Sequence, residues 1–166
     1  TEIGENRVQE LMEKYDKVSP DARWHLIGHL QKNKVKYIAD KVCMIHSLDS
    51  PKLAAEIDKQ AKKHGRVIDV LVEINSGAEE NKSGVLPDEA EALCLEISQL
   101  ENIKLKGFMT MAPKCDKKED YIKYFSFLCN IKHLNIPPLS STVKFRIFAE
   151  YVCKLCKYKL GNKNCS

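Results

Sequence analysis

A largely apolar run at residues 67–74 constrains the fold of this chain more than any other feature. It reads Val-Ile-Asp-Val-Leu-Val-Glu-Ile, which is rich in β-branched residues and mostly apolar on both faces of an extended strand. Strands that are covered on both faces belong to parallel sheets. The run therefore predicts a central strand of a parallel α/β sheet.

Strand-like and helix-like patterns alternate along the chain on either side of this run. The expected strands lie at about 24–28, 42–46, 67–74 and 103–111, after a first strand that ends near residue 3. Apolar residues spaced by three and four predict helices at about 8–15, 30–41, 50–65, 87–100 and 121–131. Five strand-then-helix units in this order predict a right-handed succession of parallel βα units.

Single residues add detail to the predicted helices and core. Ser50 and Pro51 supply a helix N-cap and first helical position, and Gly65 ends that helix. Met109 and Met111 on the late strand are expected to pack in the core.

Length and composition indicate the class of protein. A chain of 166 residues with 43% hydrophobic content can bury one substantial core and fits a single domain. No apolar run approaches the roughly 18 residues that span a bilayer, and the first residues do not resemble a signal peptide. We expect a soluble cytoplasmic protein.

The charge and the cysteines exclude little by themselves. The net charge of +4 is too mild to indicate nucleic-acid binding. The basic segment 30–41 carries Tyr37 but no aromatic platform, so a solvated helix face is favoured over a phosphate-binding surface.

Seven cysteines, an odd number, indicate free buried thiols in a reducing compartment. Cys153 and Cys156 form half of a metal or redox motif without a second half, and no zinc site is expected.

Two segments place small and polar residues where a short apolar run gives way to a helix-like pattern. Gly4 and Asn6 stand in the first segment, and Gly28 and His29 stand in the second. Open α/β sheets and barrels collect their ligand groups at the carboxyl ends of strands. We therefore expect a pocket of convergent loops, with Asn6 and His29 at the same end of the sheet.

Five blocks in one order carry a family resemblance that covers roughly residues 2 to 134. They are Gly4–Glu10, Trp24–Gln31, His46–Ser50, Ile74–Gly84 and Gly107–Thr110. They resemble the pyridoxal phosphate homeostasis proteins, whose fold is similar to the barrel domain of bacterial alanine racemases. The resemblance implies a partial (β/α)8 TIM-type barrel of the alanine racemase N-terminal type at residues 1–138, followed by a divergent tail at 139–166.

The resemblance also implies a cofactor and a role. Family members hold pyridoxal 5′-phosphate at the carboxyl ends of the strands and help to balance vitamin B6 pools, without an established turnover reaction. Their Schiff-base lysine lies on the first strand, in a segment that would precede Thr1, and a later phosphate cradle is matched poorly here. A barrel of this type takes about 250 residues. We therefore expect an incomplete barrel with weakened cofactor binding and no imine at the family's site.

Four residues are the candidate cofactor contacts. Asn6 either caps the helix that follows or contacts the ligand, and His29 is either a polar helix-start residue or a pocket residue. Lys82 could form an imine with the aldehyde if its pKa were lowered, although a solvated surface lysine is the simpler reading. Arg146 could clasp the phosphate, but its surroundings match the family poorly.

Three hypotheses about the function remain open. The first is a cofactor-binding protein of vitamin B6 homeostasis, with a small-molecule partner and no membrane or nucleic-acid partner. The second is a racemase-like enzyme, which would need an imine lysine and a second acid–base group on the other face of the cofactor. The third is a structural fragment without a ligand.

Overall fold

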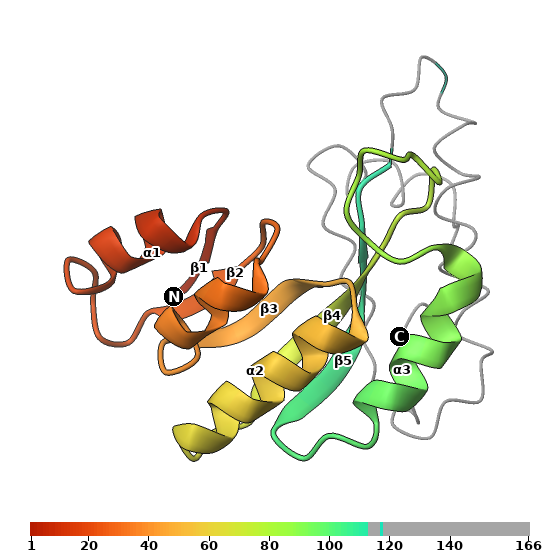
Figure 1. The fold of residues 1–166 in the computed structure, drawn as a ribbon. Coiled ribbons are helices and arrows are strands. Elements are labelled where there is room, and N and C mark those ends of the chain that lie inside the picture. The colour runs from red at the N-terminus through yellow and green to blue at the C-terminus, as the bar shows by residue number, and fades with distance from the viewer. Residues whose placement is uncertain (113–116, 118–166) are drawn as a thin grey trace, which may run out of the picture.

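The computed structural model describes residues 1–112 and 117, and these residues form a five-stranded parallel sheet with its helices on one face (Figure 1). The strands are β1 (Glu2–Glu5), β2 (Arg23–Leu26), β3 (Val42–Leu48), β4 (Ile68–Ile74) and β5 (Ile103–Thr110). The α-helices are α1 (Val8–Tyr15), α2 (Pro51–Lys63) and α3 (Ala90–Ile97), with 3₁₀ turns η1 (Lys32–Tyr37) and η2 (Pro87–Glu89).

The strand order is β1-β2-β3-β4-β5, and each strand pairs in parallel with the next one along the chain. This sequential order is the one that a (β/α) barrel requires, because every crossover returns beside the strand that it left. The predicted succession of parallel βα units is therefore confirmed for the described residues. The helix expected at 121–131, Arg146 and the tail at 139–166 lie outside them.

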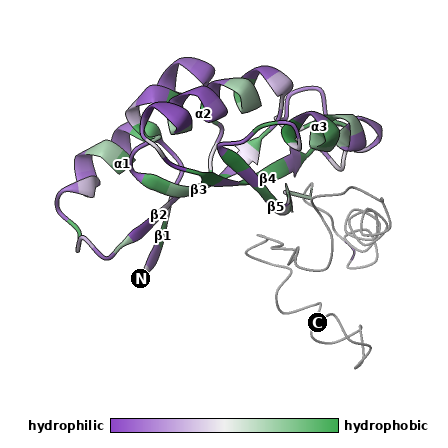
Figure 2. Ribbon diagram, turned by 90° about the horizontal axis from the view of Figure 1, so that it is seen from below, coloured by the Kyte–Doolittle hydropathy of each residue, from purple (hydrophilic) through white to green (hydrophobic). Residues whose placement is uncertain are grey.

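The main core lies between the sheet and its helices. Val70, Val72 and Ile74 of β4 pack there, together with Ile57 of α2 and Ile97 of α3. The other face of the sheet carries a smaller apolar cluster, which contains Met44, Leu71 and Met109. Figure 2 shows the helices together on one side of the sheet, with largely hydrophilic outer surfaces on α1 and α2.

The expected helix at 30–41 is wrong in type and length, because this segment forms only the 3₁₀ turn η1. The apolar residues Val35, Ile38 and Ala39 of this segment are fully buried. Its backbone hydrogen bonds from Lys34 N to Gln31 O and from Ile38 N to Val35 O each link a residue to the one three positions earlier, as in a 3₁₀-helix. Spacing by three and four buries one face of either helix type. The apolar pattern therefore could not distinguish a 3₁₀ turn from an α-helix here.

The ends of α2 follow the predicted residues with one difference. Ser50 occupies the N-cap position and Pro51 the first turn, but the Ser50 hydroxyl donates to Asp49 Oδ1 (3.1 Å) and not into the helix. Gly65 follows the C-cap residue with a φ of +61°, a left-handed conformation that favours glycine. Gly65 therefore ends the helix as expected.

The two described cysteines, Cys43 and Cys94, are free thiols. Burial raises the pKa of Cys94 to about 12, and burial also raises the pKa of the half-buried Cys43. Both thiols are therefore held in the neutral form. No helix among the described residues is long and apolar enough to cross a membrane.

Packing of α2 on the sheet should dominate the stability of this layer. Ile57 is fully buried on the inner face of α2, so Ile57→Ala should lower the free energy of unfolding by about 2–5 kcal/mol. Lys59→Ala on the exposed face of α2 is the control and should change it by less than about 0.5 kcal/mol. Urea unfolding followed by circular dichroism measures both, and equal effects would contradict the assignment of the core.

A candidate ligand site at the carboxyl edge of the sheet

The carboxyl ends of the parallel strands bring five loops to one edge of the sheet. Asn6 follows β1, His29 follows β2, Asp49 follows β3, Asn75 follows β4 and Met111 follows β5. The prediction that Asn6 and His29 lie at the same end of the sheet is confirmed. Met111 is 63% exposed at this edge, so its expected place in the core is wrong, whereas Met109 is buried as expected.

Close contact between the first two loops requires a glycine. A Cβ atom on Gly28 would lie 2.3 Å from the carbonyl oxygen of Asn6 and 2.9 Å from its Cα. The same segment is tied to its neighbours by hydrogen bonds from Ile27 N to Glu5 O (2.9 Å) and from Ser47 Oγ to Gly28 O (2.7 Å). The backbone before His29 is therefore hydrogen-bonded to Glu5 of β1 on one side and to Ser47 of β3 on the other.

The structure argues against one of the two roles that the sequence allowed for Asn6, the helix cap. The N-cap of α1 is Arg7, and no side chain forms a capping hydrogen bond there. Asn6 is exposed at the carboxyl edge. Its side chain does not cap the helix, and its carboxamide has the chemistry to contact a ligand.

His29 belongs to a group of ionisable side chains at the carboxyl ends of three neighbouring strands. Its Nδ1 atom lies 3.6 Å from Oδ2 of Asp49, and the histidine side chain is 56% exposed. Both residues also act on Glu73 of β4: the charge of Asp49 raises the pKa of that carboxyl, and the charge of His29 lowers it. The three residues therefore share one electrostatic environment.

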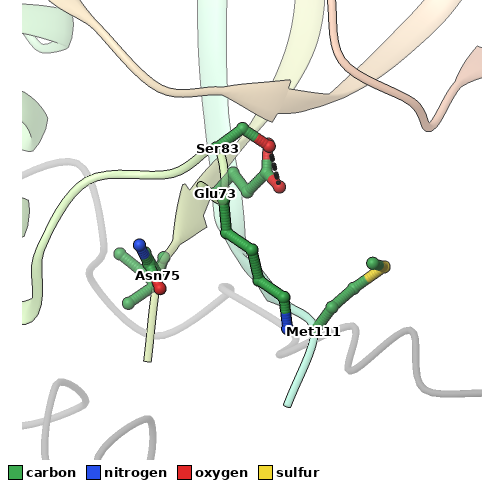
Figure 3. Close-up of a pocket in the computed structure, with 6 residues that line it drawn as sticks. Glu73, Asn75, Ser83 and Met111 are labelled. Carbon is green, nitrogen blue, oxygen red and sulfur yellow. Dashed lines mark hydrogen bonds between the residues drawn. The ribbon is translucent and has the colours of Figure 1, made fainter. Parts of the chain in front are cut away.

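Glu73 is a buried acid on the sheet face opposite the helices. It is 8% exposed, and Ser83 Oγ donates a hydrogen bond to its Oε1 atom over 2.8 Å (Figure 3). Its Oε2 atom is buried without a hydrogen-bond partner among the described residues. Burial is the largest effect on its pKa and raises it, while the Ser83 hydrogen bond acts in the opposite direction.

The loop after β4 folds back on the strand and carries Ser83 to Glu73. Asn75 N donates to Val85 O and Val85 N donates to Glu73 O, each over 2.9 Å. The Asn75 carboxamide holds the loop from inside, with Nδ2 donating to Glu79 O (2.8 Å) and Oδ1 accepting from Glu79 N (3.1 Å). Gly84 has a φ of +106°, and a Cβ there would lie 2.7 Å from Asn75 N. Only glycine fits this return.

Lys82 lies in the same loop, and its Nζ atom forms an ion pair with Glu79 Oε1 over 2.6 Å. Its side chain is 36% exposed. Lys82 lines a small cavity with Glu73 and Asn75. Asn6, His29 and Lys82 therefore lie at the same carboxyl edge of the sheet, whereas Arg146 lies outside the described residues.

The sequence pattern did not identify Asp49 or Glu73 as site residues. Asp49 directly follows a strand, which was a usable signal. Glu73 was an acid inside the apolar run at 67–74, and its side chain could be assigned to the site only once the register of β4 was known. The sequence also did not predict the buried histidine pair, in which His25 Nδ1 and His46 Nε2 lie 2.9 Å apart.

The sequence-family model of the alanine racemase N-terminal domain matches residues 1–136 of this chain. The chain belongs to this family. Among curated relatives, the pyridoxal phosphate homeostasis protein of Aquifex aeolicus is 47% identical over 130 residues, which are 78% of this chain and 57% of the relative. That of Helicobacter pylori strain 26695 is 39% identical over 126 residues, or 74% of this chain and 57% of the relative. The chain thus spans a little over half the length of these relatives.

Solved structures agree with this assignment. PipY of Synechococcus elongatus with pyridoxal phosphate bound has a TM-score of 0.70 and 30% identity, over 81% of this chain and 65% of PipY. A protein of unknown function from Bifidobacterium adolescentis has a TM-score of 0.73 and 32% identity, over 79% of this chain and 58% of that protein. An alanine racemase of Clostridium difficile, at a TM-score of 0.63 and 21% identity, shares the fold. The partial barrel and the family resemblance are confirmed.

The contact between Gly28 and Asn6 gives a direct test of the site geometry. Gly28→Ala should lower the free energy of unfolding by about 1–3 kcal/mol, because the new methyl group meets backbone atoms that cannot rotate away. Gly4→Ala is the control: its Cβ would meet the Ile27 side chain at 3.2 Å, and a side chain can move. Chemical denaturation of both variants measures the difference, and equal stability would show that the two loops do not meet as described.

Proposed function

We propose that this chain binds pyridoxal 5′-phosphate at the carboxyl edge of its sheet and acts in vitamin B6 homeostasis as a binding protein without turnover. The observation that carries the proposal is that Asn6, His29 and Glu73 lie at one edge of the sheet, on or after strands in sequential parallel order. The relative PipY has a structure with pyridoxal phosphate bound, and the curated relatives carry the name of homeostasis proteins and not of an enzyme.

The chemistry of the residues fits this cofactor. Pyridoxal phosphate presents a phosphate, a phenolic oxygen, a pyridine nitrogen and an aldehyde, which supplies an electrophilic carbon when the cofactor is bound. Asn6 offers both a donor and an acceptor, His29 can donate, and the buried Oε2 of Glu73 has open hydrogen-bonding capacity among the described residues. In this proposal Asn6 and His29 hold the ligand from the first two loops, and Asp49 orients the imidazole.

Two residues extend the proposal. Arg146 would bind the phosphate from outside the described part of the chain, as a bidentate donor. Lys82 would contact the ligand without a covalent bond, because its amine is held in an ion pair with Glu79. Residues 1–138 would form the binding domain, with the tail at 139–166 outside it.

Loss of either loop side chain should weaken the binding of pyridoxal phosphate. Asn6→Ala and His29→Ala should each raise the Kd about tenfold, because each removes one hydrogen bond at the site. His64→Ala is the matched control, since His64 is exposed at the C-cap of α2, in the connection that leads to the amino end of β4. Calorimetric titration with pyridoxal phosphate measures the Kd. No measurable binding by the unaltered chain, or equal effects of His29→Ala and His64→Ala, would contradict the proposed function.

The role of Lys82 is tested by chemical trapping. Borohydride reduction of the chain in the presence of pyridoxal phosphate, followed by peptide mapping, should give no more pyridoxyl adduct on Lys82 than on the exposed Lys104, because a protonated amine is a poor nucleophile. A stoichiometric adduct on Lys82 would show that this lysine holds the cofactor covalently.

A further inference from the structure

Two buried histidines join β2 to β3, which lie side by side in the sheet (Figure 1). The distance between His25 Nδ1 and His46 Nε2 is 2.9 Å, and the two residues are 5% and 0% exposed. His25 stands between Trp24 and Leu26, which pack in the main core, so its own side chain lies on the face opposite the helices. Neither ring belongs to the candidate ligand site.

The rings meet where β3 departs from regular pairing. Relative to β2, β3 has one extra residue between the partners of Trp24 and His25. Relative to β4, it has another between Ile45 and Leu48, the stretch that contains His46. Such bulges often lie next to functional sites, where they redirect a side chain.

The geometry of the pair limits how many protons it can hold. One ring donates its N–H group and the facing nitrogen of the other ring accepts. A first added proton preserves this bond, because an imidazolium donates to the neutral ring. A second added proton would place two N–H groups face to face and two positive charges on adjacent buried rings. The folded pair therefore holds at most one added proton.

The pair is connected through the backbone to the loop that carries His29. His46 directly precedes Ser47, whose Oγ donates to Gly28 O over 2.7 Å. Asp49, two residues further along the chain, lies 3.6 Å from His29 Nδ1. A movement of His46 away from β2 therefore acts on both of these contacts.

We propose that His25 and His46 form a proton-controlled latch between β2 and β3. With no added proton or with one, the latch is closed and the loop of His29 is held at the carboxyl edge. When both rings are protonated they separate, and the bond from Ser47 to Gly28 is lost with them. The latch rests on the proposed function only for the identity of the ligand whose affinity follows it.

Charged groups on β1 and β2 favour the first proton on the pair. Glu2 Oε1 lies 4.0 Å from His25 Nε2 and can balance one positive charge there. The same carboxylate oxygen lies 3.9 Å from Arg23 Nε, so part of its charge is already balanced. Cys43 of β3 adds no charge, because burial raises the pKa of its thiol.

The charged groups of β4 and β5 on this face do little to favour a second proton. Asp69 of β4 forms an ion pair with Lys106 of β5 over 3.4 Å and lies in register with Lys104. Glu73 lies nearer the carboxyl end of β4, and burial raises the pKa of its carboxyl, so it loses its negative charge at higher pH than an exposed glutamate.

The latch can be tested by folding measurements without any ligand. The unfolded chain protonates both histidines below about pH 6.5, whereas the folded pair holds at most one added proton. The unfolded state then binds more protons, so the folding equilibrium constant should fall as the pH falls. Urea unfolding is followed by the fluorescence of Trp24, which is the single tryptophan and is buried.

His46→Gln is the informative variant, because its amide keeps a hydrogen-bonding partner for His25 but does not titrate. Below about pH 6.5, the folding constant of the unaltered chain relative to this variant should fall by about tenfold per pH unit, the effect of one proton. His25→Asn should behave like His46→Gln. His64→Gln is the control and should parallel the unaltered chain, because His64 is exposed. Parallel curves for the unaltered chain and His46→Gln would overturn the latch.

NMR of the unaltered chain gives a test that needs no variant. The imidazole signals of His25 and His46 are followed as the pH is lowered, together with the fluorescence of Trp24. At most one of the two rings should become protonated while Trp24 remains buried. Protonation of both rings in a chain that is still closed by this criterion would contradict the proposal.

Binding measurements test the connection to the candidate site. The Kd for pyridoxal phosphate in the unaltered chain, divided by that in His46→Gln, should rise as the pH falls, by up to about tenfold per pH unit once the latch opens. Titration of the ligand and of His29 cancels in this ratio. A ratio that does not change with pH would overturn the connection. Absence of binding by both chains at every pH would overturn the proposed function, whereas unfolding and NMR would still decide the latch.

Discussion

Backbone pairing of β4 with its two neighbours determines where the polar groups of this protein can lie. Alternate residues of a strand point to opposite faces of the sheet, so Val70 and Val72 pack under the helices while Leu71 and Glu73 lie on the other face. A shift of register by one residue would exchange these sets and bring the carboxyl of Glu73 against α2 and α3. The apolar contact that holds Val72 under the helices therefore also holds Glu73 on the opposite face of the sheet, on the side of the candidate site.

Two close backbone contacts complete the carboxyl edge. Gly28 allows the loop after β2 to touch Asn6, and Gly84 allows the loop after β4 to return onto Asn75. Neither contact leaves room for a Cβ atom, and side-chain hydrogen bonds from Ser47 and Asn75 hold the same two loops. A ligand then meets groups that are already ordered, which reduces the entropy lost on binding.

The sequence predicted the parallel βα order and the edge at which Asn6 and His29 meet, because strand and helix periods survive in short apolar segments. It did not predict the 3₁₀ turn at Lys32–Tyr37, since the spacing of its apolar residues suits both helix types. Met111 lies just past the end of β5 and is exposed, a difference of one residue that periodicity cannot resolve. Glu73 required the register of β4 and the return of the loop that carries Ser83, and both are tertiary features.

A buried carboxyl at position 73 is by itself unfavourable for folding, and this relates the stability of the sheet to pH. Leu71 and Met109 show that the same face accepts apolar residues, and an apolar side chain would avoid the desolvation that raises the pKa of Glu73. An acid whose pKa is raised in the folded state makes folding less favourable as the pH rises through that pKa, because the unfolded chain then gives up the proton more readily. Proton binding and folding are therefore linked at this one residue.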